Sequence, residues 1–390
     1  MHEFTFNTTP RVQMAPGGAA RLGEIVAAAE LAPAGAAVLF VTDPGILRLG
    51  LAAPALADLE TQGFEPVLFD AIEPDPKATT VEAAAERARA AGAACIIGFG
   101  GGSSMDVAKV AALLLGSDQG LDEMYGVGLA RGKRLPLVLV PTTAGTGSEV
   151  TPVSILTTGT AEKKGISSPL ILPDLALLDA DLTLGLPPAV TAATGVDAMV
   201  HAIEAYTSRS ANANPVSRML AVQALGLLSG AIRSAVADGS DRSARADMLL
   251  GAMLAGQAFA NAPVAAVHAL AYPVGSLFGV PHGLSNALVL AEVMRFNAPE
   301  AGAEYAALAP HIFPEIDTGR SSQTVAAELV ERLAALNAEL GLEPGLRGVG
   351  IGAGDIPKLA EDAMRQTRLL VNNPREVTFE DAARIYEASL

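Results

Sequence analysis

The pattern of apolar and polar positions changes near the middle of the chain. In the first half, short apolar runs alternate with Ala-rich segments of helical period. The runs that predict buried strands are 36–41, 65–70, 94–99 and 135–140, and short strands are expected over 153–178. The segments that predict helices are 80–91, with Thr79 or Thr80 as its N-cap, and 104–115. This alternation favours a parallel sheet with helices on both faces.

From about Pro187 the pattern becomes that of helices. Strand-like alternation is scarce, and long Ala-, Leu- and Met-rich segments dominate: 189–207, 215–236, 243–261, 285–296, 322–340, 356–370 and 378–390. Pro187-Pro188 cannot extend a helix backwards, so a boundary is expected there. The sequence therefore predicts an α/β domain over residues 1–184 and a helical domain over 185–390.

One stretch, 248–291, contains no Asp, Glu, Lys or Arg. It is long enough to span a bilayer, which takes ~20 residues per helix. Polar and helix-breaking residues interrupt it throughout: Gln257, Asn261, Pro263, His268, Tyr272, Pro273, Pro281 and His282. This density predicts a buried helical core that holds a site, and no membrane span.

The net charge and the cysteine content limit which partners and which metal sites the chain can have. The formal net charge of −16 would repel a polyanion, so nucleic acid and anionic membranes are poor candidates. The start of the chain lacks the basic and apolar parts of a signal peptide, and a cytoplasmic location is expected. Cys95 is the single cysteine, which excludes an intrachain disulfide and a thiolate metal cluster. Its apolar surroundings predict an inert buried thiol.

Two loops follow predicted strands and concentrate glycine and hydroxyl residues. The first, 98–106, runs into a helix, a context in which backbone N–H groups and the helix N-terminus can bind phosphate. The second, 141–149, carries Thr and Ser hydroxyls at the end of the next strand, where open α/β sheets bind ligands. Taken alone, the glycine run fits a tight turn as well as a nucleotide site, and the second loop fits a helix-capping turn equally well. Asp43, also at a strand end, is either a ribose ligand or a turn residue.

The helical half contains a candidate metal site. Asp197 and His201 are spaced i, i+4 and share one helix face. His268 and His282 lie in the uncharged stretch. One carboxylate with three imidazoles is a sensible ligand set for Fe²⁺ or Zn²⁺. Each histidine alone is more often a hydrogen-bonded core residue, but the set together points to a site assembled by the fold.

At these residues the sequence resembles the iron-containing (group III) alcohol dehydrogenase family, along nearly its whole length. The matching stretches are GFGGGSSMDVAK (98–109), PTTAGTGSEVT (141–151), DAMVHAIEAYTS (197–208), VHALAYPVG (267–275), VPHGLSNALVL (280–290) and NNPREVT (372–378). The resemblance implies a Rossmann-like N-terminal domain and a helical C-terminal domain, an architecture shared with dehydroquinate synthase. It implies a homodimer that interconverts a small alcohol and its aldehyde or ketone with NAD, NADP being the less expected cofactor.

The resemblance also assigns residues. It implies metal ligands at Asp197, His201, His268 and His282, with Fe²⁺ expected and Zn²⁺, Mn²⁺ or Co²⁺ also compatible. It gives the cofactor the loop residues together with Asp43 and Lys163: Gly100, Gly101, Gly102, Ser103, Asp106, Thr142, Thr143, Thr146 and Ser148. His268 and Tyr272 are the expected catalytic residues. Val153, Phe259, Tyr272 and residues near 364–373 are expected to line the substrate pocket, which would suit a small, partly apolar molecule. Arg368 is either a partner for an acidic substrate group or, as the favoured interpretation, a solvated surface residue.

The chain departs from the family pattern at two positions. Tyr272 stands where many members carry a second histidine, four residues after His268, and a phenol is a poor proton acceptor near neutrality. Proton transfer is then expected through the cofactor ribose or Tyr272. Asp75 stands where the family often has Asn.

Other functions remain as alternatives. A hydroxyacid–oxoacid transhydrogenase would keep the fold and hold its nicotinamide tightly. A lyase of the dehydroquinate synthase kind would use NAD and a metal, but Asp197 stands where its shell usually has Glu. A metallohydrolase would leave the glycine and threonine loops without a purpose, and a non-catalytic binding protein would not explain the ligand set.

Overall fold

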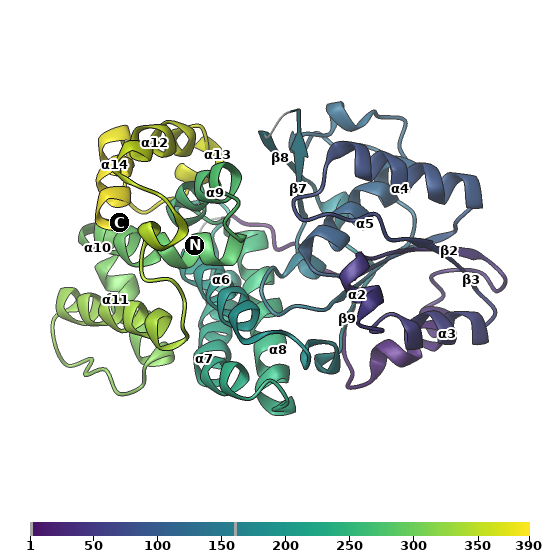
Figure 1. The fold of residues 1–390 in the computed structure, drawn as a ribbon, viewed down its shortest axis with the longest axis horizontal. Helices are drawn as coiled ribbons and strands as arrows, with labels where there is room; N and C mark the ends of the chain where they lie inside the picture. The colour runs from purple at the N-terminus through teal and green to yellow at the C-terminus, as the bar shows by residue number, and fades with distance from the viewer. Residues whose placement is uncertain (1–2, 160–161) are drawn as a thin grey trace. The chain divides into compact units, whose positions relative to one another are not determined.

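A computed structural model describes residues 3–159 and 162–390. The chain divides into two compact units. Residues 7–143 and 147–185 form the first, called here the α/β unit, and residues 3–6, 144–146 and 186–390 form the second, called the helical unit. In Figure 1 the α/β unit runs from purple to teal, and residues 186–390 of the helical unit run from teal to yellow.

The α/β unit is built on a six-stranded parallel sheet, which confirms the predicted sheet type. Its strands, in spatial order, are β1 (Val12–Met14), β9 (Leu175–Leu178), β6 (Leu137–Pro141), β4 (Cys95–Gly100), β2 (Ala37–Val41) and β3 (Glu65–Phe69). A second sheet has the order β5 (Gly126–Val127), β8 (Glu162–Ser167) and β7 (Val153–Thr158), with β7 and β8 antiparallel. The parallel strands place their carboxyl ends, and the loops that follow, at one edge.

Both faces of the large sheet are covered, as the alternation predicts. Leu39 and Val41 belong to one buried cluster with the helices α4 (Ala78–Ala91) and α5 (Gly102–Leu115). Val38 and Phe40, one residue out of step, belong to a second cluster with α1 (Leu22–Ala28), α2 (Pro44–Arg48) and α3 (Ala53–Thr61). Successive side chains of a strand point to opposite faces, so a fully apolar run supplies both cores.

Two local predictions in this unit have opposite outcomes. The predicted N-cap of the helix at Thr79 or Thr80 is wrong, because α4 begins at Ala78 with Lys77 in the capping position. Among the described residues, no side chain caps this helix; the Glu73 carboxylate instead accepts from the Lys77 backbone N–H at 3.2 Å and from the Thr80 hydroxyl at 2.8 Å. The inert thiol is confirmed: Cys95 is fully buried, and burial raises its pKa to about 12.

The described part of the helical unit consists of helices and loops. The helices are α6 (Pro188–Thr207), α7 (Pro215–Ala237), α8 (Arg242–Asn261), α9 (Ala266–Phe278), α10 (His282–Ile312), α11 (Ser322–Glu339), α12 (Ile356–Met364), α13 (Thr367–Leu370) and α14 (Phe379–Ala388). α7 is long and apolar enough to cross a bilayer, but it packs along α6 and α8 within the unit. The charge-free stretch lies on α8, α9 and the start of α10, so the predicted helical core is found there.

Candidate metal centre and nucleotide-binding loops

Helix α6 presents two polar side chains to the core of the helical unit. Asp197 and His201 are one turn apart, and both are buried. The His201 Nε2 atom lies 4.0 Å from the Asp197 Oδ1 atom. A carboxylate and an imidazole rarely share a buried helix face unless a partner or a ligand compensates the loss of water.

Two more histidines reach the same point from α9 and α10. The Nε2 atoms of His268 and His282 lie 3.8 and 3.7 Å from Asp197 Oδ1. Gly283 permits this approach of α10 to α6, because a Cβ there would lie 2.4 Å from the Ala193 carbonyl oxygen. One ligand atom from each of the four residues lies within 4.8 Å of the other three, so the structure brings the whole predicted ligand set together.

The arrangement fits a bound cation. The Asn286 side-chain nitrogen donates to Asp197 Oδ1 at 2.6 Å and lies 3.3 Å from Nε2 of both His268 and His282. Three lone pairs therefore converge on one positively polarised group, as they would on a metal ion. Nitrogen and carboxylate oxygen donors in this number match what Fe²⁺ and Zn²⁺ prefer.

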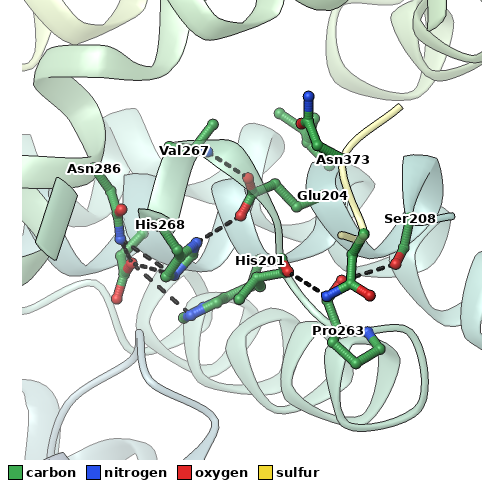
Figure 2. A network of polar contacts seen from close by, with 12 residues as sticks. His201, Glu204, Ser208, Pro263, Val267, His268, Asn286 and Asn373 are labelled. Carbon is green, nitrogen blue, oxygen red and sulfur yellow. Dashed lines mark hydrogen bonds and ion pairs between the residues drawn. The ribbon is translucent and has the colours of Figure 1, made fainter. Parts of the chain in front are cut away.

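Glu204 fixes the orientation of His268. Its Oε2 atom lies 2.6 Å from His268 Nδ1, and its Oε1 atom accepts the Val267 backbone N–H at 2.7 Å. Figure 2 shows His268 between Glu204 and Asn286. A carboxylate at Nδ1 keeps the proton on that nitrogen and leaves the Nε2 lone pair facing the cluster.

The charge states of the cluster suit metal binding. Burial lowers the pKa of His201 to about 3, even though the Asp197 carboxylate acts in the opposite direction, so the imidazole is neutral at pH 7. Burial raises the pKa of Asp197, but the three imidazoles and the Asn286 amide outweigh it and lower the pKa overall. A neutral imidazole and an ionised carboxylate are the forms that coordinate metals.

Aromatic rings border the cluster. Phe259 stacks on His201 with ring centroids 4.4 Å apart. The Tyr272 ring centroid lies 5.8 Å from that of His282 and 6.4 Å from that of His268. Of the residues expected to line the substrate pocket, Phe259 and Tyr272 thus border the four-residue cluster, whereas Val153 lies on β7 in the α/β unit.

In the α/β unit, the glycine loop lies between β4 and the first turn of α5. Gly101 is the N-cap of α5, and Gly102 and Ser103 are its first residues. A Cβ at Gly100 would lie 2.6 Å from the Ser104 hydroxyl oxygen and 3.5 Å from Asp43 Oδ2. Only glycine therefore leaves the backbone of this turn open to a ligand.

The loops after β2 and β6 meet the glycine loop. Asp43 caps α2, its Oδ1 atom accepting from the backbone N–H groups of Gly45 and Ile46. The Thr142 N–H donates to the Gly100 carbonyl at 3.0 Å, and a Cβ at Gly101 would lie 3.8 Å from the Thr143 hydroxyl oxygen. The structure therefore brings Asp43, Gly100 and Thr143 to one sheet edge. Thr146 belongs to the short segment that groups with the helical unit.

Two buried hydroxyl groups at this edge suit a polar ligand. Among the residues that the structure describes, Ser104 Oγ and Thr42 Oγ1 are buried and meet no hydrogen-bond partner. Ser104 lies in the first turn of α5, where the helix N-terminus favours negative charge. Open backbone, helix N-terminus and unpaired hydroxyl groups together fit a dinucleotide pyrophosphate.

Asp106 and Ser148, expected at the cofactor, are tied to each other behind the loops. The Ser148 hydroxyl donates to Asp106 Oδ1 at 2.7 Å, and the Ile155 N–H donates to Asp106 Oδ2 at 2.9 Å. Lys109, fully buried, donates to the Ser148 hydroxyl at 2.7 Å and to the Val153 carbonyl at 2.9 Å. This network joins α5 to the threonine loop and to β7, so it fixes both loops in place.

Lys163 and Asp75 form an ion pair with the Lys163 Nζ atom 2.5 Å from Asp75 Oδ1. The Thr157 hydroxyl accepts from Lys163 at 3.1 Å and donates to the Asp75 carbonyl at 2.9 Å. The replacement of the family's Asn by Asp at this position is thus accompanied by a direct contact with the lysine expected at the cofactor.

Glu204 and Asn286 are not among the residues predicted from the sequence. Glu204 follows Asp197 by seven residues, and Asn286 follows His282 by four, spacings that place each on the same helix face as a ligand. This periodicity, applied to all polar residues around the four ligands, would have found both.

Comparisons with known proteins agree with this architecture. The iron-containing alcohol dehydrogenase model matches residues 10–180, and the C-terminal model of the same family matches residues 191–390. Long-chain-alcohol dehydrogenase 1 of Geobacillus thermodenitrificans is 41% identical over 90% of this chain and 89% of its own.

Solved structures are similar throughout. The crystal structure of a 1,3-propanediol oxidoreductase has a TM-score of 0.94 and 34% identity, with 100% of both chains covered. A sulfoacetaldehyde reductase from Bifidobacterium kashiwanohense, solved with NAD⁺, has a TM-score of 0.87 and 28% identity, covering 100% of this chain and 99% of that one. The chain therefore belongs to the iron-containing alcohol dehydrogenase family and is a metal-dependent, NAD-linked oxidoreductase of alcohols and aldehydes.

Proposed function

We propose that the chain uses NAD in preference to NADP as a freely exchanging cosubstrate, and that Asp197, His201, His268 and His282 hold Fe²⁺. The observation that carries the proposal is the convergence of three imidazoles and one carboxylate within 4.8 Å in the core of the helical unit. Zn²⁺ and Mn²⁺ are acceptable to the same donor set, and the family's iron favours Fe²⁺.

The chemistry of the bound groups is simple. When present, the cation polarises an alcohol or carbonyl oxygen as a Lewis acid, and the nicotinamide exchanges a hydride with the substrate carbon. The protein holds both in place. Glu204 locks the His268 ring through Nδ1, and Asn286 steadies Asp197 through Oδ1.

The remaining roles belong to the side chains around the cluster and to the loops. Phe259 provides an apolar wall beside His201, and Tyr272 supplies a phenol that can donate a proton or pass it to the cofactor ribose. Gly100 to Ser103 bind the pyrophosphate, Thr142, Thr143 and Thr146 bind toward the nicotinamide, and Lys163 contacts the cofactor. We also propose that Val153 contacts the substrate.

Preference for NAD follows from Asp43. Its carboxylate lies beside Gly100, with Oδ1 used in the helix cap and Oδ2 turned toward the glycine turn. A carboxylate there accepts hydrogen bonds from ribose hydroxyl groups and repels the additional 2′-phosphate of NADP. We also propose a cytoplasmic homodimer, which size-exclusion chromatography with light scattering would test.

The testing experiment combines metal analysis with initial rates. The purified chain is expected to bind about one metal ion per chain at the cluster. It is expected to reduce NAD⁺ faster than NADP⁺ with short alcohols, diols or hydroxy acids. Metal without NAD⁺ turnover, together with nucleotide released on denaturation, would instead indicate a transhydrogenase. Equal rates with NAD⁺ and NADP⁺ would contradict the role of Asp43.

A further inference from the structure

An arginine stands next to the aromatic border of the metal-binding cluster. Arg368 is exposed on the short helix α13, which packs against α9 (Figure 1). Its guanidinium carbon lies 6.0 Å from the centroid of the Tyr272 ring. The same ring lies 5.8 Å from that of His282. A cation over an aromatic face is attracted by the ring quadrupole, so this contact holds the guanidinium beside the cluster.

The backbone of Arg368 is also fixed to the loop that precedes α9. The buried Asn372 side chain donates to the Arg368 carbonyl and to the Val264 carbonyl, both at 3.1 Å. The Asn372 carbonyl accepts the Arg209 N–H at 2.8 Å. The chain around α13 is therefore attached to the loop before α9, the helix that carries His268 and Tyr272, and to the loop after α6, which limits how far Arg368 can move.

In the described part of the chain, Arg368 makes no ion pair, although the protein has a net charge of −16. The acidic groups of the neighbouring helix are engaged elsewhere: Arg365 contacts Glu361 at 2.7 Å and Asp362 at 3.1 Å. A fixed, unpaired cation beside an active site is suited to bind an anionic group of a substrate.

We propose that Arg368 forms a subsite for an anionic group, and that the preferred substrates are short alcohols or aldehydes bearing a carboxylate or a sulfonate. The inference rests on the proposed function. The planar guanidinium binds the oxygens of either group through paired N–H donors. The Tyr272 ring, which neighbours both Arg368 and His282, would border the short carbon chain between this subsite and the metal ligands.

The test compares two substrates that differ in charge and little else. NAD⁺ reduction is measured with 3-hydroxypropanoate and with its neutral amide, 3-hydroxypropanamide, and the ratio of their kcat/KM values is recorded. In the wild type the acid is expected to be preferred. Arg368→Gln is expected to lower the acid-to-amide ratio about tenfold, mostly through KM, because a charge-assisted hydrogen bond is lost. The ratio cancels any change in Tyr272 that affects both substrates.

Two further variants separate this role from a structural one. Arg365→Gln, a loss of the same charge on the neighbouring turn, is expected to leave the ratio unchanged. Arg368→Lys keeps the charge without the planar fork and is expected to recover part of the preference. Parallel assays with 2-hydroxyethanesulfonate show whether sulfonate or carboxylate is the better anion.

Two results would overturn the anionic subsite, and a third would overturn the proposed function. An acid-to-amide ratio that Arg368→Gln leaves within the change caused by Arg365→Gln overturns the anionic subsite. So does turnover of neutral alcohols with neither the acid nor the sulfonate accepted, in which case the proposed function stands. Failure of every alcohol to support NAD⁺ reduction in the metal-loaded enzyme would overturn the proposed function itself.

Discussion

The metal-binding cluster and the nucleotide-binding loops use different parts of the chain to bind different kinds of ligand. The cluster uses side-chain atoms from three helices, with ligands as far apart in sequence as Asp197 and His282. The loops use backbone and small hydroxyl groups at the ends of adjacent parallel strands, β2, β4 and β6. A compact cation needs donor atoms at one point, whereas an extended dinucleotide needs an open surface.

This difference predicts where each region is vulnerable. Removing one imidazole from the cluster deletes a donor that no neighbour can replace. In the loops most side chains contribute little, and the damaging change is the addition of atoms at a glycine. Each region should therefore fail by itself, which can be measured by assaying metal binding and dinucleotide binding separately.

The largest expected effect comes from the cluster. His268→Ala removes a ligand and leaves Glu204 without its partner. We expect turnover to fall by about a thousandfold or more, because the Lewis acid is lost. Metal content should fall with it, while dinucleotide binding largely survives, because the glycine and threonine loops proposed to bind NAD⁺ are unchanged. Metal analysis and NAD⁺ titration check both; retained metal-dependent turnover would refute the ligand assignment.

The reverse result is expected for the glycine loop, where a substitution should weaken NAD⁺ binding and leave metal binding intact. At Gly100→Ala the new Cβ would meet the Ser104 hydroxyl oxygen at 2.6 Å, so the turn must shift. We expect NAD⁺ affinity to weaken about tenfold or more, because small-to-large changes in packed regions force the backbone to move. Metal content should stay at the wild-type level. Gly120→Ala, where a Cβ has open space, serves as the control, and unchanged NAD⁺ affinity in Gly100→Ala would contradict the proposed cradle.

A smaller effect is expected at Glu204, which supports the cluster through His268. Glu204→Gln keeps the shape but removes the charge at His268 Nδ1. We expect metal affinity to fall about 10–100-fold, the usual consequence of losing such a partner. Competition with a chelator measures this without relying on turnover. Glu300→Gln, an exposed carboxyl on α10, is the matched control, and equal metal affinity in both variants would show that Glu204 has only a packing role.

The smallest effect concerns stability beneath the threonine loop. Burial raises the pKa of Glu149 from 4.5 to about 7, with Lys109 acting in the opposite direction. Because the folded state favours the protonated Glu149 carboxyl, the contribution of this group to the free energy of unfolding is fully present below pH 4.5. It is lost as the pH rises to about 7. The loss is on the order of 1–3 kcal/mol.

Glu149→Gln removes that titration. Melting temperatures measured from pH 4.5 to 8 in the presence of a chelator should fall more steeply for the wild type than for the variant. The two curves should run parallel above pH 7. A constant difference across the whole range would mean that Glu149 does not titrate in this window.

The sequence was most informative where a residue type itself indicates its role, as apolar runs do for buried strands and histidines do for metal ligands. The apolar runs gave the parallel sheet, and Asp197 with three histidines gave a cluster that the structure assembles. Glu204 and Asn286 were not predicted because neither is itself a ligand: each lies at helical spacing from one, but each also contacts His268, which comes from another helix. α10 begins at His282 and continues through Pro299 and Pro310, so proline alone did not mark its ends.

Other features depend on tertiary contacts between residues far apart in the chain, which a local sequence pattern does not predict. Lys109 lies in an apolar helical segment, and its role in fixing the threonine loop depends on Ser148 and Val153, which lie far along the chain. Arg368 is an ordinary exposed arginine in the sequence. Its contact with the Tyr272 ring beside the metal-binding cluster is visible only in the structure.

The most direct test of the central claim is a metal titration of the chelator-treated chain. The account predicts that NAD⁺ reduction is absent without metal, rises with added Fe²⁺ and saturates near one equivalent per chain, with His268→Ala failing to respond. Full NAD⁺-linked turnover in the metal-free wild type, or saturation in the His268→Ala variant at the same stoichiometry, would contradict it.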